Sequence, residues 1–494
     1  MSHSKNSTYS TLFGLITALL FMLSAAGALA QRISYESLRM RDRQSNVFLE
    51  HLVIPNAEPS QLTLVSIFRL ENNFLFFRRY QGNHITKEQR SFYAEPTLRL
   101  TVRKADSRED ERLQESKRPR GAWQSRESLS SQDTWPPSGN SEVVASSSWR
   151  DTIYTETYEQ TQSASSFVQN LIKTDLFPGV YSIEYMVASD NQTRRGRSPQ
   201  LRVVDTSNTD IAYFYFLDNQ SELPSSDSTP LMNMGHNVFY GRDHQLAIWF
   251  PEIHDEADYA LEIHKLQIQH RDTSVLDLAF EHSIDKEQLI SGFLPEISQK
   301  DHRPHFNLHS SNASRGQFYI LHIPNSKFEN AWYRIRLRKK MDEDEKIIAS
   351  RTYQSLWLDM PISLLNIDVA INMLRFILDS ERVRSLQSGN RREKEQQFRE
   401  FWAGRDPSPD SEYNELMVEY YRRIDYAFEH FTTPQTPGYE SDLGKVYIRH
   451  GEPVRRERNF PPNQPAREIW HYDGHTFVFE ATTGFGDYQL VERR

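Results

Sequence analysis

A few charged residues near the C-terminus have the types and spacing that could support chemistry. Arg405 and Asp406 lie just before a proline, Arg423 follows within the next helical pattern, and Asp442 stands two residues before Gly444. Guanidinium groups beside a carboxylate can grip an anionic group or polarise a carbonyl, so these side chains could line a pocket. Catalysis by Asp442 as a general base lacks support, because no paired His or second carboxylate is evident.

A structural role for the same residues is the competing hypothesis. Asp442 could accept hydrogen bonds from backbone N–H groups and fix a turn, with the glycine two residues later at a positive φ angle. Arg405 and Asp406 could pair with Asp442, Arg422 or Arg423 where helices meet a sheet. Because charged motifs at the junctions of elements commonly set geometry, internal bracing is the favoured hypothesis over a pocket.

Histidines are the next candidates, since imidazole is a common metal ligand. The histidines of the middle of the chain show neither a helical i, i+4 pair nor a close strand pair beside a carboxylate, so we interpret them as surface side chains. They are His254, His264, His282, His302, His305 and His309. His471 and His475 flank an Asp473-Gly474 turn, which would point them to opposite faces of a hairpin and prevent shared chelation. We therefore expect no metal site and no cofactor.

Composition excludes several classes of function. The chain contains no cysteine, which excludes a thiol nucleophile, a cysteine-ligated metal site and a lipid-modified N-terminal cysteine. Its formal net charge of −9 argues against nucleic acid as a partner, because that affinity depends on Lys and Arg neutralising phosphates. The 494 residues suffice for about three domains, each able to bury a core without disulfides.

The N-terminal residues 1–30 predict export. Lys5 precedes an apolar run from Leu12 to Leu23, and small residues follow up to Ala30, which is the order of a secretory signal peptide cleaved before Gln31. The alternative is an uncleaved membrane anchor, because the apolar stretch approaches the length of a bilayer span. No later stretch is long and apolar enough to cross a membrane. We expect a periplasmic or extracellular protein without a membrane span after cleavage.

The first part of the mature chain is predicted to be a β-sandwich over 31–206. Alternating apolar residues over 62–70 indicate a strand, and Asn72-Asn73 could form a tight turn to a strand returning over 74–77. Pro178-Gly179 opens a strand led by Tyr181, which resembles the corner of an immunoglobulin-like sandwich. A polar insertion over 106–148 cannot bury enough apolar surface to order itself, so we expect it to be mobile.

A second β-sandwich is predicted over 207–358. Strand patterns recur at 211–217, 245–250, 261–269, 317–323 and 331–337. Phe328 and Tyr333 repeat the spacing of Leu176 and Tyr181 in the first sandwich, a faint echo that fits two related sandwiches in tandem. Sandwiches outside the cytoplasm commonly serve as spacers or binding modules, although that inference is an analogy of fold.

From 359 to 494 the pattern becomes helical and ends in a hairpin. Ser408 is expected to cap the third helix, with Pro409 in its first turn. The hairpin's aromatic side chains would share one face and pack on the helices. The predicted elements are helices over 367–388, 391–403 and 409–431, a strand over 445–449, and a hairpin of strands over 469–472 and 475–479.

Five segments of this region occur in a specific order: FWAGRDPSP (401–409), YYRRIDYAFEHF (420–431), PGYESDLGKVYIRHGEP (437–453), EIWHYD (468–473) and FVFE (477–480). Together they resemble the GWxTD domain, a module of bacterial exported proteins named for a Gly-Trp-x-Thr-Asp motif. Here Tyr439 stands in place of Trp and Ser441 in place of Thr, between Gly438 and Asp442, so an aromatic ring and a hydroxyl are kept. The resemblance implies location and architecture, since the family has no assigned reaction.

These observations favour an exported cell-envelope protein that acts as a binding or scaffold module. Two tandem immunoglobulin-like sandwiches would carry a C-terminal helical and hairpin domain that docks an envelope protein or polymer. The alternative hypothesis is an envelope hydrolase with its site in the last domain; a non-enzymatic role is preferred because no nucleophile or metal set is evident. The candidate site residues are Arg405, Asp406, Arg423, Gly438, Tyr439, Ser441, Asp442 and Gly444.

Overall fold

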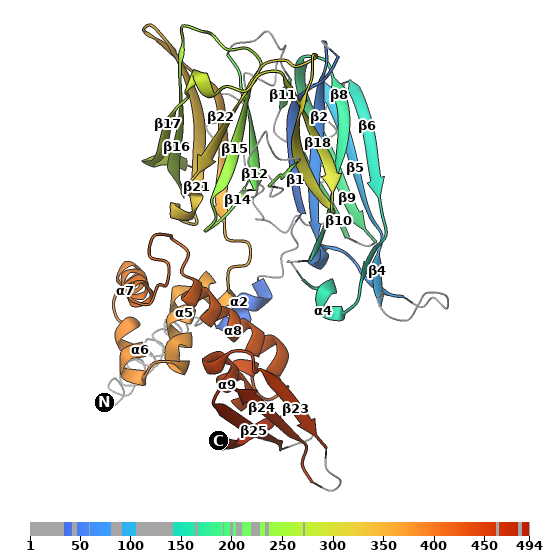
Figure 1. Cartoon of the computed structure of the whole chain (residues 1–494). Coiled ribbons are helices and arrows are strands. Elements are labelled where there is room, and N and C mark those ends of the chain that lie inside the picture. The colour runs from blue at the N-terminus through green and yellow to red at the C-terminus, as the bar shows by residue number, and fades with distance from the viewer. Residues whose placement is uncertain are drawn as a thin grey trace, which may run out of the picture. The chain divides into compact units, whose positions relative to one another are not determined.

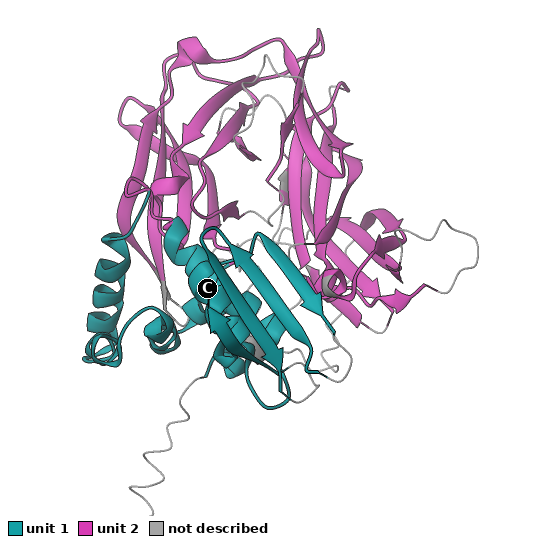
Figure 2. Ribbon diagram, turned by 60° about the horizontal axis from the view of Figure 1, so that its bottom comes forward, with its two compact units in different colours: residues 1–43, 360–407, 415–494 teal, residues 44–359, 408–414 magenta. Residues whose placement is uncertain are grey.

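The protein is represented by a computed structural model that divides into two compact units (Figure 1). Unit 1 comprises 1–43, 360–407 and 415–494, and unit 2 comprises 44–359 and 408–414 (Figure 2). The fold is mainly β with a C-terminal helical and hairpin region, which confirms the predicted fold class. The described residues are 34–41, 47–58, 60–80, 91–104, 142–163, 166–190, 192–197, 201–203, 210–218, 228–232, 237–269, 272–460, 464–482 and 487–493.

Several sequence-based expectations fall outside those residues. The predicted signal peptide over 1–30 is one, and most of the insertion predicted over 106–148 is another. In the part that the structure describes, no helix is long and apolar enough to cross a membrane. The division of 31–358 into two sandwich domains stays a prediction.

The first half of unit 2 packs two sheets around one core. One sheet has the strand order β1-β2-β8 and the other β10-β9-β5-β6, with β11 also paired to β9. Buried Leu, Ile, Val and Phe side chains from both sheets form a common cluster. The bounds are β1 (Val47–Pro55), β2 (Leu62–Glu71), β5 (Pro96–Lys104), β6 (Val143–Arg150), β8 (Phe167–Leu176), β9 (Gly179–Ser189), β10 (Gln192–Arg197) and β11 (Leu201–Val203). The small sheet β3 (Arg78–Arg79), β4 (Phe92–Ala94) and β7 (Ile153–Thr155) and the short helix α4 (Tyr158–Thr161) lie beside them.

The second half of unit 2 contains a sheet that is buried on both faces. Its strands run in the order β12-β15-β20. Tyr215, Ala247 and Trp249 join the core of the first half, whereas Phe216 and Ile248 join a separate core with the sheet β14-β22-β21-β16-β17. The near-continuous apolar run of β15 is the sequence pattern of a strand buried on both sides. The bounds are β12 (Tyr213–Asp218), β14 (Val238–Phe239), β15 (His244–Phe250), β16 (Asp258–Gln269), β17 (Asp272–Ser283), β20 (Gln317–Ile323), β21 (Trp332–Met341) and β22 (Asp344–Leu356). A further sheet pairs β13 (Thr229–Pro230), β19 (Arg303–Ser310) and β18 (Phe293–Lys300).

The spacing that Leu176 and Tyr181 share with Phe328 and Tyr333 corresponds to the same local structure in both halves of unit 2. The Tyr181 hydroxyl donates to the carbonyl oxygen of Phe177, four residues upstream, at 2.9 Å. The Tyr333 hydroxyl likewise donates to the carbonyl oxygen of Glu329 at 3.2 Å. A tyrosine that bonds back to the chain just before its strand is the corner expected of an immunoglobulin-like sandwich.

Two sequence-based expectations in this unit were wrong. Asn72-Asn73 does not form a hairpin turn, because the chain enters the 3-10 turn η1 (Asn72–Phe74) and β2 pairs with β1 and β8 instead. Residues 143–148, assigned to the insertion, belong to β6, which pairs with β5 along its length. The serine side chains of β6 give its sequence little apolar signal, so the strand was not recognised. Pairing with β5 holds β6 in the sheet, and Trp149 packs on Phe68 with ring centroids 4.8 Å apart.

Unit 1 combines helices with a C-terminal sheet of order β23-β24-β25-β26. The N-terminal helix α2 (Tyr35–Arg41) belongs to this unit, far from its neighbours in sequence. The remaining bounds are η4 (Ile362–Leu365), α5 (Ile367–Met373), η5 (Leu374–Phe376), α6 (Ser380–Leu386), α7 (Arg391–Ala403), α8 (Glu415–Phe431), η6 (Gly438–Glu440), α9 (Asp442–His450), β23 (Arg455–Asn459), β24 (Arg467–Tyr472), β25 (His475–Ala481) and β26 (Tyr488–Arg493).

Helix α7 and the hairpin β24–β25 confirm the predictions for this region, but three other elements differ. The single helix predicted over 367–388 is divided into α5, η5 and α6, with Asp379 capping α6. The third helix begins at Glu415 rather than after Ser408, because Tyr413 packs on Tyr240 and Trp357 within unit 2. The strand predicted over 445–449 is part of helix α9.

Candidate binding site

The motif segment between α8 and α9 is a place where backbones approach closely. A Cβ atom on Gly438 would lie 1.9 Å from the carbonyl oxygen of Ala427 in α8, and one on Gly444 would lie 1.9 Å from the carbonyl oxygen of Gly438. Real Cβ atoms do not approach oxygen so closely, so both positions require glycine. The requirement comes from packing, because Gly444 lies inside α9 and does not take the positive φ angle that we predicted.

The next two motif residues organise the start of α9. The Ser441 hydroxyl accepts a hydrogen bond from the Gly444 N–H at 3.0 Å and donates to the carbonyl oxygen of Gly438 at 2.7 Å. Serine and threonine are both effective N-caps, which explains why either hydroxyl suits this position. The Asp442 carboxylate accepts from the Leu490 N–H of β26 at 3.0 Å and lies 3.4 Å from the Lys445 ammonium. Asp442 thus bonds to backbone N–H as expected, but between a helix and a strand.

Tyr439, the aromatic residue of the motif, is buried against the N-terminal helix α2. Its ring meets Tyr35 edge-on at 5.4 Å between centroids, and its hydroxyl donates to the Glu36 carboxylate. Burial raises the pKa of Tyr439, and the Glu36 carboxylate raises it further. The Tyr35 hydroxyl in turn donates to Asp425 of α8 at 2.7 Å. The motif therefore contributes a buried anchor for the beginning of the described chain.

Arg423 lies on α8 and is part of a different contact. Its guanidinium donates to Glu419 at 2.7 Å, the i, i+4 pair expected from the sequence. The same guanidinium lies next to the C-terminal end of α9, because a Cβ atom on Gly451 would be 3.0 Å from it. Among the contacts of the described residues, none joins Arg405, Arg423 and Asp442 to one another.

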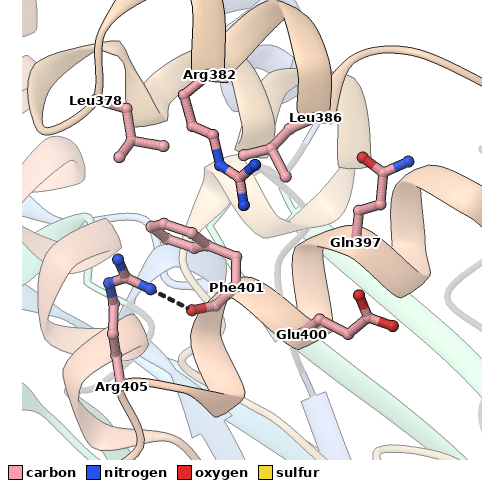
Figure 3. A pocket seen from close by; sticks show the side chains of 7 residues that line it. All are labelled: Leu378, Arg382, Leu386, Gln397, Glu400, Phe401 and Arg405. Atoms are coloured by element: carbon pink, nitrogen blue, oxygen red, sulfur yellow. Dashed lines mark hydrogen bonds between the residues drawn. The ribbon is translucent and has the colours of Figure 1, made fainter.

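Arg405 instead lines a pocket between α6 and α7 (Figure 3). The pocket has a volume of about 370 Å³, near the lower end of ligand sites, which suits one end group or side chain rather than a long polymer segment. Phe401 and Leu386 border it but are only 6% and 2% exposed, so its accessible lining is mainly polar. The lining residues are Leu378, Arg382, Leu386, Gln397, Glu400, Phe401 and Arg405.

Two guanidinium groups give this pocket its electrostatic character. Figure 3 shows Arg382 and Arg405 on either side of the Phe401 ring, with the Glu400 carboxylate directed away from both. Arg405 donates to the carbonyl oxygen of Phe401 at 2.9 Å and stacks on its ring at 4.1 Å, which leaves further N–H groups available. Within the described parts of the chain, neither arginine forms an ion pair with a carboxylate. The arrangement can bind an acidic group.

Residues 363–492 match the profile of the GWxTD domain family. This region is a GWxTD domain. The match covers the motif segment, the pocket and the hairpin, and it confirms the resemblance noted in the sequence. No curated protein sequence matches the chain.

Three solved structures are distantly similar to the chain. A purple acid phosphatase from yellow lupin (Lupinus luteus) seeds is 6% identical over 64% of this chain and 41% of its own, with a TM-score of 0.17. The C-terminal domain of the antigen I/II-family protein AspA of Streptococcus pyogenes is 9% identical over 62% and 99%, with a TM-score of 0.14. That of BspA of Streptococcus agalactiae is 8% identical over 63% and 100%, with a TM-score of 0.13. The chain thus spans under half of the lupin enzyme, and scores this low carry no argument about fold or function.

The sheet of the GWxTD domain has the register predicted for its hairpin. Tyr472 pairs with His475, Trp470 with Phe477, and Gly474 takes the positive φ angle of the turn. Trp470 and Phe477 are buried with Leu443, Val446 and Tyr447 of α9, so the aromatic face packs on a helix. His471 and His475 lie on opposite faces, and among the described residues no three acidic or histidine side chains could hold a metal ion.

Sequence reasoning found Arg405 of the pocket but missed its partners. Arg382 sits on α6, which was absorbed into one long predicted helix, so the turn that brings α6 against α7 was not foreseen. Asp379, a good N-cap residue just before Ser380, was the available signal for that break.

Proposed function

We propose that this is an exported binding or scaffold protein of the cell envelope whose GWxTD domain holds an acidic group of its partner in the α6/α7 pocket. The observation that carries the proposal is the placement of Arg382 and Arg405 in one pocket, without carboxylate partners among the described residues. Guanidinium groups bind carboxylates and phosphates in a fixed fork geometry, and the nearby Phe401 and Leu378 suit an apolar attachment.

The other motif residues support this division of roles. Gly438, Ser441 and Gly444 are occupied by backbone packing and helix capping, and Tyr439 by α2. These contacts make the motif part of the frame of the domain, which supports looking for the ligand at the α6/α7 pocket instead. Envelope location rests on the leader predicted over 1–30.

A carboxylate probe tests the proposal. Octanoate carries a carboxylate on an apolar chain, and octanamide has the same shape without the charge. In a calorimetric titration of the full chain we expect octanoate to bind more tightly than octanamide. Arg382→Gln and Arg405→Gln should each weaken octanoate about tenfold or more, as expected for the loss of a charge-assisted hydrogen bond.

Arg384→Gln is the matched control, because Arg384 lies on the same helix outside the pocket lining and bonds to the carbonyl oxygen of Ser380. It should leave the octanoate affinity unchanged. Equal affinities for the two probes, or an equal loss in Arg384→Gln and Arg405→Gln, would overturn the proposal.

A further inference from the structure

A second cluster of cationic side chains lies at the other end of the GWxTD domain, where α9 meets the sheet. His450 ends α9, and its ring centroid is 6.1 Å from that of His475 and 5.0 Å from that of Phe477. Arg493 of β26 lies over the same Phe477 ring at 5.5 Å. Three elements thus bring His450, His475 and Arg493 about one aromatic side chain, and all three are exposed to solvent.

The charges of this cluster are not balanced by ion pairs in the described part of the domain. His450, His475 and Arg493 form no hydrogen bond or ion pair there. Two further arginines, Arg449 and Arg423, belong to the same cationic cluster. Arg449 donates to the carbonyl oxygen of Phe376 at 2.9 Å, and Arg423 forms an ion pair with the Glu419 carboxylate. Next to the cluster, the Tyr472 hydroxyl donates a hydrogen bond to the carbonyl oxygen of Gly451 at 2.8 Å.

The electrostatics of His450 agree with this excess of positive charge. Burial lowers the pKa of His450, and Arg493, His475, Arg449 and Arg423 lower it further. Of the carboxylates near it in the chain, Glu419 is engaged by Arg423, and Glu452 is exposed and follows Gly451. Three arginines against these two carboxylates leave the surface positive.

We propose that the cluster of Arg423, Arg449, His450, His475 and Arg493 binds a phosphate group, free or at the end of a larger molecule. A phosphate brings up to two negative charges and three acceptor oxygens, which suits donors that converge from α8, α9, β25 and β26. The buried Phe477 ring packs beneath the cationic groups, and the half-buried Tyr472 ring lies edge-on to it at 5.7 Å between centroids. This site is separate from the α6/α7 pocket, and its test does not depend on that pocket.

Titration of the full chain with inorganic phosphate at constant ionic strength tests the proposal. We expect saturable binding of phosphate. The double variant His475→Gln, Arg493→Gln should weaken binding about tenfold or more. Glycerol phosphate as a second probe distinguishes the sources: equal affinity indicates recognition of phosphate alone, and tighter binding of the ester indicates a larger phosphorylated ligand.

Arg467→Gln is the matched control, since Arg467 lies on the same sheet outside the cluster and pairs with Glu480 at 3.8 Å. It should bind phosphate as the wild type does. A circular dichroism spectrum and a thermal midpoint like those of the wild type establish that the double variant is folded; if it is not, His450→Gln is read in its place. The proposal would be overturned if phosphate binding does not saturate. It would also be overturned if chloride at matched ionic strength competes for the cluster as strongly as phosphate does.

Discussion

The two compact units bury polar groups in different ways. Unit 2 buries charge: Glu50 of β1 is 2% exposed and forms an ion pair with Arg351 of β22, whose guanidinium also lies over the Phe216 ring at 4.8 Å. Burial raises the pKa of Glu50 and lowers that of Arg351, although each opposes the effect on the other. Removing two charges from water is costly, and the attraction between them offsets part of that cost.

Unit 1 buries neutral hydroxyl groups that bond to the backbone. The Tyr420 hydroxyl donates to the carbonyl oxygen of Met373 at 2.6 Å, and that of Tyr421 donates to Ala370 at 2.8 Å. The ion pair Arg391–Glu395 is by contrast on the surface, with Arg391 85% exposed. The difference among the described residues is one of degree: unit 2 encloses both partners of the Glu50–Arg351 pair, whereas the buried Glu468 of unit 1 pairs with Arg458, which is 65% exposed.

The largest effect should follow from breaking the buried pair of unit 2. We expect Glu50→Gln to lower the free energy of unfolding by about 3–5 kcal/mol, because Arg351 keeps its buried charge without a carboxylate. Hydrogen exchange read by mass spectrometry reports each unit separately and should show the loss in unit 2.

The double variant Glu50→Leu, Arg351→Met is the companion measurement. It should be more stable than Glu50→Gln, because both charges are removed together. The surface variant Glu395→Gln should cost about 0.5 kcal/mol or less. A Glu50→Gln protein as stable as Glu395→Gln would contradict the importance given to buried charge.

Unit 1 should be most sensitive where backbones touch. Gly444→Ala places a Cβ against the carbonyl oxygen of Gly438, so the elements must move apart at a cost of about 3 kcal/mol, the upper end for overpacking. Gly404→Ala is the control in the same domain, because its φ of −68° is ordinary and its Cβ would meet the nearest atom at 3.8 Å. Thermal unfolding should show a lower midpoint for Gly444→Ala alone; matching midpoints would show that the α9 packing is less tight than described.

Acid should weaken unit 2 through its buried histidines. Burial lowers the pKa of His51 to about 4 and that of His244 to about 3. Below pH 6.5 the unfolded chain gains a proton that the folded imidazole does not, so stability falls as the pH falls. The loss is about 1.4 kcal/mol per pH unit for each histidine, or about 2 kcal/mol at pH 5.

His244→Phe tests this directly, since both ring nitrogens of His244 lack hydrogen-bond partners among the described residues. Denaturant unfolding at pH 7 and pH 5 should show a loss that is smaller by about 2 kcal/mol in the variant. His309→Gln, at a side chain 56% exposed, should leave the wild-type loss unchanged. An undiminished loss in His244→Phe would mean that His244 is not the source of the acid sensitivity.

The smallest effect should come from single hydroxyl groups of unit 1. Tyr421→Phe removes the bond to the Ala370 carbonyl oxygen and should cost about 1 kcal/mol, seen as a small drop in the denaturation midpoint. Tyr426→Phe is the control, because Tyr426 stacks on Tyr447 and donates no hydrogen bond within the described residues. Equal stability of the two variants would remove hydroxyl bonding from the account of unit 1.

Elements with strong local signals could be predicted from the sequence. The β24–β25 hairpin follows from its Asp-Gly turn and alternating aromatics, and the two tyrosine corners follow from the spacing around Tyr181 and Tyr333. Helix α9 could not be predicted, because its short apolar run fits either period. The segment becomes a helix because Leu443, Val446 and Tyr447 then share one face that packs on the hairpin.

The candidate site was predictable only in part for the same reason. Arg405 stood out by its motif, but its place beside Arg382 depends on the break before α6. The role of Tyr439 depends on Tyr35 and Glu36, which have no local sequence signal that connects them to the C-terminal region. Contacts between segments so distant in the chain arise from tertiary packing, which periodicity does not report.

The most direct test of the central claim is the thermal midpoint of Arg405→Gln with and without octanoate, beside the wild type. The account predicts at most a small drop in the midpoint without octanoate, from loss of the bond to the Phe401 carbonyl oxygen, and loss of the stabilisation that octanoate gives the wild type. A midpoint several degrees lower without octanoate, with the octanoate shift retained, would contradict it and make Arg405 a bracing residue.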